Sequence, residues 1–300
     1  MRDAARCLLT SFLLLLSLSA IIQGCAGPVL RTYSATDREI ASVEIAFARF
    51  LEITQETCSC CLDAEADAAL AVSGWFSDHT GRLSGYLQAM EPGYLRFVAV
   101  NPLGQPLLIL ASDGKIFKYL DILHEKAYIG SVDSAPYRKF APPGFEPGFS
   151  YYWLTGRMQP GEIQIAAVKR GEERDTFWLK INHSGSDTES MVLFAPEDMV
   201  ILRHVLLDGR GKIFFDIRYT GYQLLERTKK STAAGGRSDD HAGLDPAEGK
   251  CRVPAGVSVS SRKGAERIAI ELRSFLSDVY FTAADFHIDI PANFEQLLVK

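Results

Sequence analysis

The histidines and the acidic residues near them are the first candidates for chemistry in this chain. None of the histidines lies in an H-E-x-x-H zinc motif, and the chain has neither a G-x-S-x-G nucleophile elbow nor a G-x-x-x-x-G-K-[ST] phosphate loop. Asp121 and His124 are the closest acid–base pair, but a hydrogen-bonded surface pair accounts for the same spacing. We therefore expect no enzymatic activity. The six histidines are His79, His124, His183, His204, His241 and His287.

The N-terminus has the plan of a secretory signal peptide. Arg2 and Arg6 precede an apolar stretch that ends near Ile22, and the small residue Gly24 stands before Cys25. An uncleaved membrane helix is the alternative, since about 20 apolar residues span a bilayer. The residues Ile22-Gln23-Gly24-Cys25 resemble the lipobox of bacterial lipoproteins, which favours cleavage. The resemblance implies a covalent diacylglycerol and an N-acyl lipid on Cys25, and we expect no other cofactor.

This resemblance also predicts a location and a division of the chain. Ala26 follows the lipidated cysteine in place of the aspartate that commonly retains lipoproteins at the inner membrane. The expected location is therefore the periplasmic face of the outer membrane, with the protein lipid-anchored. We expect a lipoprotein signal peptide at 1–24, a lipidated tether at 25–37 and one domain at 38–300, although the length also suits two small domains.

Charge and cysteine spacing exclude two classes of partner. Residues 1–24 hold two arginines and one aspartate, so their removal changes the formal net charge from −5 to −6. A domain of this charge is a poor candidate for nucleic-acid binding, which requires basic patches. The C-x-C-C cluster of Cys58, Cys60 and Cys61 lacks the C-x-x-C spacing of zinc sites, so we expect no metal. In the periplasm these residues and Cys251 would form a local disulfide or remain thiols.

The remaining pattern predicts a mainly β (α+β) fold. Apolar residues at three- and four-residue spacing predict an amphipathic helix over 36–57. Many short alternating runs with brief turns then indicate a curled antiparallel sheet forming an open half-barrel. The proline- and aromatic-rich segment 129–160, with a short helical turn near 148–155, is expected to act as a lid over an apolar concavity, and 228–250 as a disordered insertion. Predicted strands are 68–76, 82–89, 94–100, 106–112, 115–120, 126–129, 162–169, 175–181, 191–194, 200–207, 213–222, 257–260, 267–276 and 286–291.

Three segments carry a family resemblance: the hairpin of residues 94–110, the W-x-x-G-like stretch of residues 152–156 and the proline-containing turn of residues 252–257. They resemble LolB, the outer-membrane receptor family that accepts lipoproteins from the periplasmic carrier LolA. The likeness covers roughly residues 65–285. The proline-rich lid, the 228–250 insertion and a longer tail beyond residue 276 depart from the family pattern, which leaves a divergent paralogue open.

The resemblance implies an outer-membrane lipoprotein that binds acyl chains of other lipoproteins in a hydrophobic cavity and helps to insert them in the membrane. Its expected partners are acylated lipoprotein cargo, a LolA-like periplasmic carrier and outer-membrane lipid, and the protein is expected to be a monomer. The alternative is a membrane-tethered structural or envelope-binding lipoprotein with a filled core. A soluble carrier fits less well, because a lipid anchor on Cys25 would prevent it from diffusing.

Two groups of residues follow from these expectations. Asn101-Pro102-Leu103-Gly104 matches a type I β-turn, with Leu103 at its apex. A single exposed leucine usually carries no function, but the LolB resemblance implies that Pro102, Leu103 and Gly104 form a membrane-insertion loop. Ordinary core packing is the alternative for the residues expected to line the acyl-binding cavity: Trp75, Phe97, Leu108, Phe117 and Trp153.

Overall fold

The computed structural model describes most of the chain after the predicted tether. The predicted signal peptide, Cys25, Trp75 and nearly all of the 228–250 segment lie outside the described residues. The described ranges are 30–57, 61–71, 81–134, 137, 150–185, 188–226, 250–261, 267–276 and 280–299.

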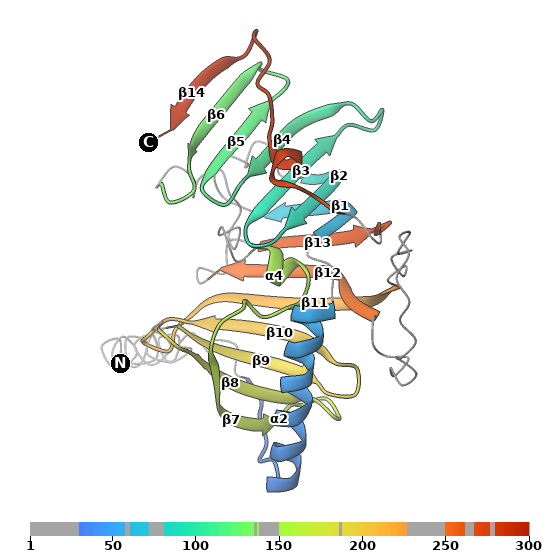
Figure 1. The fold of residues 1–300 in the computed structure, drawn as a ribbon, viewed down its shortest axis with the longest axis vertical. Helices are drawn as coiled ribbons and strands as arrows, with labels where there is room; N and C mark the ends of the chain where they lie inside the picture. The colour runs from blue at the N-terminus through green and yellow to red at the C-terminus, as the bar shows by residue number, and fades with distance from the viewer. Residues whose placement is uncertain are drawn as a thin grey trace, which may run out of the picture.

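Within these ranges, one sheet of fourteen strands dominates the structure (Figure 1). Its order is β14-β6-β5-β4-β3-β2-β1-β13-β12-β11-β10-β9-β8-β7, so β14 and β7 are its two edges. Neighbouring strands are antiparallel except for the parallel pair of β14 and β6. The strands are β1 (Cys61–Ala71), β2 (Gly81–Met90), β3 (Tyr94–Val100), β4 (Pro106–Ser112), β5 (Ile116–Asp121), β6 (Lys126–Ser131), β7 (Ile163–Arg170), β8 (Phe177–His183), β9 (Glu189–Ala195), β10 (Val200–Leu207), β11 (Ile213–Glu226), β12 (Lys250–Ser261), β13 (Arg267–Arg273) and β14 (Glu295–Val299).

The sheet curls rather than lying flat, and helices cover one of its faces. Figure 1 shows that the strands near β14 run in a clearly different direction from those near β7, and that α2 crosses β7–β10 on one side. The helix α2 (Asp37–Glu52) continues as a single π-helical turn, η1 (Ile53–Thr57). A short helix, α4 (Ser150–Leu154), lies near the middle of the sheet. The predicted mainly β fold with an open, curled sheet is therefore confirmed.

Most predicted elements are present, with three corrections. The proline-containing turn predicted at residues 252–257 is wrong, because these residues lie within β12 and pair with β11. The first strand begins at Cys61 rather than near residue 68. Its buried positions are small or aliphatic, including Leu62, Ala64 and Ala66, and they alternate with acidic residues. Alanine and aspartate are depleted in strands, so their alternation is a weak strand signal.

The predicted last strand at 286–291 is wrong. That region holds a 3₁₀ turn, η3 (Ala283–Phe286), followed by extended chain, and the final strand β14 starts only at Glu295. The alternation arises because Ile288 packs on the sheet without pairing to it. Ile288 is buried, and its carbonyl oxygen accepts a hydrogen bond of 2.8 Å from Lys118 Nζ.

Both faces of the β3–β6 part of the sheet are apolar. The face toward the helices, here called the inner face, belongs to the main core cluster. The opposite, outer face carries a second cluster of Ala111, Leu120 and Ala127, which Ile288 covers. The C-terminal segment 281–294 therefore straps the outer face, and Tyr94 and Phe286 meet there with ring centroids 5.3 Å apart.

Candidate acyl-binding face and hairpin tip

The turn between β3 and β4 presents Leu103 to solvent on a rigid support. The side chain of Leu103 is 83% exposed. Asn101 Oδ1 accepts hydrogen bonds from the backbone N–H groups of Leu103 (2.9 Å) and Gln105 (3.0 Å). The N–H of Gly104 donates to the carbonyl of Asn101 at 2.9 Å, which is the bond expected of a β-turn. Gly104 has a φ of +80°, a conformation that residues with a Cβ rarely adopt.

Three residues predicted to line a cavity share the inner face. Phe97 is paired with Leu110, and Ala99 with Leu108. Directly opposed and alternate residues share a face of a sheet, so Phe97 and Leu108 point the same way. Phe117 joins them, because it pairs with Ser112, which lies on that face two residues beyond Leu110.

These side chains differ in how completely they are covered. Leu108 and Phe117 are buried, and Phe97 is only partly buried at the edge of the same cluster. Trp153 reaches that cluster from α4 and is fully buried. The structure thus brings together four of the five predicted residues, and Trp75 lies outside the described ranges.

The helix α2 covers the inner face over the β7 half of the sheet. Its buried residues are Val43, Phe47 and Phe50, all on one side of the helix. The Phe50 ring lies 5.5 Å from that of Phe194 on β9, centroid to centroid. Protein side chains therefore occupy this part of the inner face.

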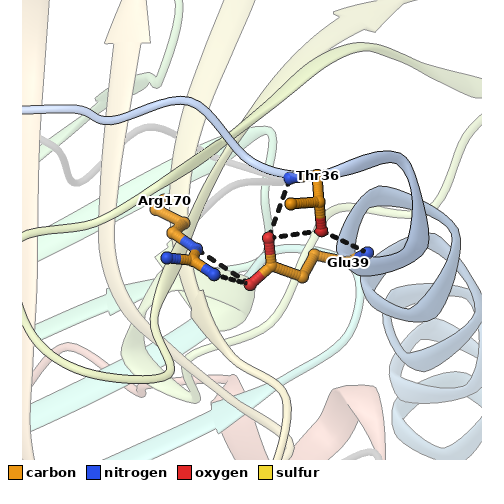
Figure 2. A network of polar contacts seen from close by, with 3 residues as sticks. All are labelled: Thr36, Glu39 and Arg170. Atoms are coloured by element: carbon orange, nitrogen blue, oxygen red, sulfur yellow. Dashed lines mark hydrogen bonds and ion pairs between the residues drawn. The ribbon is translucent and has the colours of Figure 1, made fainter.

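A polar network fixes the N-terminus of α2 to the edge strand β7 (Figure 2). Thr36 and Glu39 form a capping box, in which Glu39 Oε2 accepts from the Thr36 backbone N–H at 2.8 Å. The other carboxylate oxygen of Glu39 accepts from Arg170 Nε at 2.8 Å and from Arg170 Nη2. The Arg170 guanidinium and the bonds from Thr36 lower the pKa of Glu39 to about 2. The Glu39 carboxylate thus stays ionised at the point where the N-terminus of α2 contacts the edge strand β7.

The W-x-x-G-like stretch is the end of α4. Arg157 N donates to the carbonyl of Tyr152 at 2.7 Å across the turn that closes the helix. Gly156 there has a φ of +68°, and a Cβ on it would stand 2.5 Å from the hydroxyl oxygen of Tyr222. Glycine is required at this point both by the backbone conformation and by the close approach of β11.

Arg157 places a cation beside the buried aromatic residues of α4. Its Nη1 donates to the Tyr151 hydroxyl at 2.7 Å, and its side chain is only 6% exposed. Burial raises the pKa of Tyr152 to about 12, and the nearby Glu91 carboxylate adds to the shift. Burial also raises the pKa of Glu91, while Arg157 opposes that rise. This end of the helical cover is therefore held partly by buried polar contacts.

A buried His–Ser–His cluster on the inner face was missed by the sequence analysis. Ser190 Oγ lies 2.7 Å from His183 Nε2 and 2.9 Å from His204 Nε2. Ser190 and His204 are buried, and burial together with nearby His183 lowers the pKa of His204 to about 3. No local motif marks the cluster, since its members come from three different strands.

The remaining candidates for chemistry are accounted for by surface and covalent contacts. His124 Nδ1 lies 2.8 Å from Asp121 Oδ2 in an exposed turn, as expected for a surface pair. Cys251 is disulfide-bonded, and Cys61 Sγ accepts a hydrogen bond of 3.4 Å from the backbone N–H of Phe281. Cys58 and Cys60 lie outside the described residues. The described residues contain no group of three or more potential metal ligands. Within those ranges, no helix combines the length and hydropathy needed to cross a bilayer.

The comparisons with known proteins concern the fold. No protein-family model matches the sequence, and no curated protein matches it at a significant level. Among solved structures, a DUF1329 family protein from Desulfovibrio piger superposes with a TM-score of 0.50 at 9% identity, covering 82% of this chain and 97% of that one. The two chains share a fold. At this identity the likeness does not extend to activity or ligands.

Two looser matches come from proteins connected by name with lipoprotein sorting. A domain proposed to sort outer membrane lipoproteins, from Vibrio parahaemolyticus, has a TM-score of 0.48 at 10% identity, covering 80% of this chain and 97% of that one. A LolA superfamily protein from Nitrosomonas europaea has a TM-score of 0.45 at 8% identity, with coverage of 80% and 97%. At TM-scores below 0.5 neither match supports a conclusion about this chain.

Proposed function

We propose that the protein is a lipid-anchored outer-membrane lipoprotein of LolB-like type, which holds acyl chains of other lipoproteins against its inner face and helps to insert them in the membrane. The observation that carries the proposal is the exposed Leu103 on a locked hairpin whose strands also carry the apolar inner-face residues Phe97 and Leu108. A lipid on Cys25, as its lipobox-like context predicts, would hold this tip near the bilayer.

Acyl chains of a lipoprotein need an apolar surface while they are away from a membrane. Each methylene withdrawn from water contributes about 0.8 kcal/mol, so a lipoprotein with several acyl chains cannot cross an aqueous space unaided. An inner face of aliphatic and aromatic side chains offers these chains an apolar surface without any catalytic group. Phe97 is the only one of the four described candidates that is partly buried rather than buried, so the inner face is least covered there.

Because α2 and α4 side chains already lie on this face, acyl chains would enter beside Phe97 by displacing part of the cover. Phe97 and Val98 then form a matched pair for mutation, since adjacent residues of β3 point to opposite faces and both are partly exposed. Phe97→Asp should weaken uptake of a fluorescent fatty acid, whereas Val98→Asp should not. If both variants fold and take up the fatty acid equally well, the inner face does not bind acyl chains.

Leu103 is tested by transfer rather than uptake. A LolA-like protein loaded with a labelled lipoprotein is mixed with liposomes that carry the mature protein, and the rate of label transfer is measured. Leu103→Glu should leave fatty-acid uptake unchanged and slow transfer about tenfold or more, since burying a leucine side chain contributes about 1.5–3 kcal/mol. Leu298→Glu is the control, because Leu298 is 76% exposed on β14.

The predicted lipid anchor on Cys25 is tested separately, by membrane fractionation. Cys25→Ala should release the protein to the soluble fraction. Retention of that variant on membranes would indicate an uncleaved N-terminal helix instead. If the protein takes up no acylated ligand and transfers none, the remaining candidate is a tethered structural lipoprotein with a filled core.

A further inference from the structure

A second hairpin places another exposed leucine at the same end of the sheet as Leu103. Leu123, in the turn between β5 and β6, is 67% exposed. Leu108 near the start of β4 pairs with Asp121 at the end of β5, and the N–H of Ile122 donates to the carbonyl of Leu107 at 3.1 Å. The two turns therefore project from the same end of the sheet. With neighbouring strands about 4.8 Å apart, the bases of hairpins two strands apart lie about 10 Å from one another.

The second tip is held as firmly as the first. Asp121 Oδ1 accepts a hydrogen bond of 3.1 Å from the backbone N–H of His124, and its Oδ2 contacts the His124 ring. Glu125 closes the turn with a φ of +50°, and its carbonyl accepts from Glu295 N at 2.8 Å. Leu123 thus projects from a turn braced on both sides, by β4 and by the start of β14.

The two tips differ in the charged side chains around them, and this difference determines how deeply each leucine can enter a lipid bilayer. The first tip, residues 101–106, contains no ionisable side chain, and neither does the turn 291–294 that leads into β14. The second tip has Asp121, His124, Glu125 and Lys126 close to Leu123. Asp121 is largely covered, with a side chain 16% exposed, and is already hydrogen-bonded. Leu103 can therefore enter hydrocarbon, whereas Leu123 is confined to the shallower interface, with its charged neighbours at headgroup level.

We infer that Leu103 and Leu123 together form a two-tip contact with a lipid bilayer, in which Leu123 fixes the tilt at which Leu103 enters. The inference rests on the proposed function and adds a residue to it. A bilayer suits these tips better than a protein, because a specific protein interface buries about 800 Å² on each partner in a complementary surface. Two separate protrusions lack such a surface, and lipid deforms around them. The acidic second tip favours a zwitterionic lipid over an anionic one.

The contact is measured on the mature, lipid-anchored protein in phosphatidylcholine vesicles that contain lipids brominated at defined chain depths. Three variants, Leu103→Trp, Leu123→Trp and Leu298→Trp, are compared with the unaltered protein. Added fluorescence should be quenched at 103 by deep bromines, at 123 by shallow bromines only, and at 298 by neither. Position 123 behaving like 298 would overturn the inference, as would shielding of 123 only after a carrier protein is added.

Transfer assays separate this inference from the proposed function. Leu123→Glu should slow transfer about threefold to tenfold without changing fatty-acid uptake, and Leu103→Glu/Leu123→Glu should be slower than either single variant. An effect of Leu103→Glu with none of Leu123→Glu would overturn the two-tip contact and leave the proposed function standing. Quenching at both tips in a protein that transfers no cargo would support the membrane contact and contradict the proposed function.

Discussion

The ring of Phe47 on α2 meets the ring of Phe194 on β9 edge to face, with centroids 5.2 Å apart and planes at 80°. Both side chains are fully or almost fully buried, so this contact joins the helix to a strand that lies far away in the sequence. Edge-to-face aromatic pairs contribute about 0.5–1.5 kcal/mol beyond their burial. The contact therefore helps to hold α2 on the inner face, together with Phe50 and the Glu39–Arg170 contact.

Phe47→Ala should lower the free energy of unfolding by about 3–5 kcal/mol, because it removes a buried aromatic side chain and leaves a cavity. Urea unfolding followed by circular dichroism measures the change. Ile45→Ala is the matched control on the same helix, since Ile45 is 72% exposed and its loss should cost less than about 0.5 kcal/mol. Similar losses for the two variants would show that α2 is not packed as described.

The His–Ser–His cluster should make the protein less stable in mild acid. The folded-state pKa of His204 is about 3, against 6.5 for an ordinary histidine, so the unfolded chain binds more protons between these values. The free energy of unfolding should therefore fall as the pH falls below about 6.5, by about 2 kcal/mol at pH 5. Burial lowers the pKa of His183 as well, which acts in the same direction.

Urea midpoints measured between pH 7 and pH 5 test this effect. The low pKa of Glu39 acts only below its ordinary value of 4.5, and the raised pKa of Glu91 acts in the opposite direction to that of His204. A comparison of the unaltered protein with a His204 variant therefore isolates the histidine. His204→Gln keeps a side chain that can hydrogen-bond Ser190 but cannot take up a proton, and it should flatten the pH dependence. An unchanged slope in this variant would mean that His204 does not titrate with unfolding.

The C-terminal strap should be needed to cover the outer face of the sheet. Ile288→Asp places a carboxylate against Ala111, Leu120 and Ala127, and should cost at least about 2 kcal/mol or release the strap. Release would appear as faster amide exchange in residues 281–299 and as early proteolysis there. Leu298→Asp, at an exposed position, is the control. Unchanged exchange in Ile288→Asp would show that the strap does not depend on this contact.

Several elements could be predicted from residue patterns because local forces determine them. The hairpin turn at Asn101 is an example, since one asparagine side chain binds two backbone N–H groups within four residues. The capping box of Thr36 and Glu39 marks the start of α2 for the same reason. The helical turn at α4 was also expected, and its closing Gly156 is explained by contact with Tyr222, which no local pattern contains.

Other features depend on which strands become neighbours. The last strand was placed too early because Ile288 alternates like a strand residue but packs on the outer face instead of pairing. The His–Ser–His cluster cannot be predicted from a local pattern, because only the pairing of β8, β9 and β10 brings its members together. The position of Leu123 at the same end of the sheet as Leu103 follows only from the pairing of β4 with β5.

By itself the amino-acid sequence determined the β-rich fold, the amphipathic N-terminal helix and the locked turn that exposes Leu103. These depend on residue periodicity and on hydrogen bonds between residues close in the chain. The tertiary structure alone decided which face of each strand is covered, that α2 packs on Phe194, and that two leucine-bearing turns share one end of the sheet. Such contacts join distant residues through strand register, and a shift of one residue would turn every side chain to the opposite face.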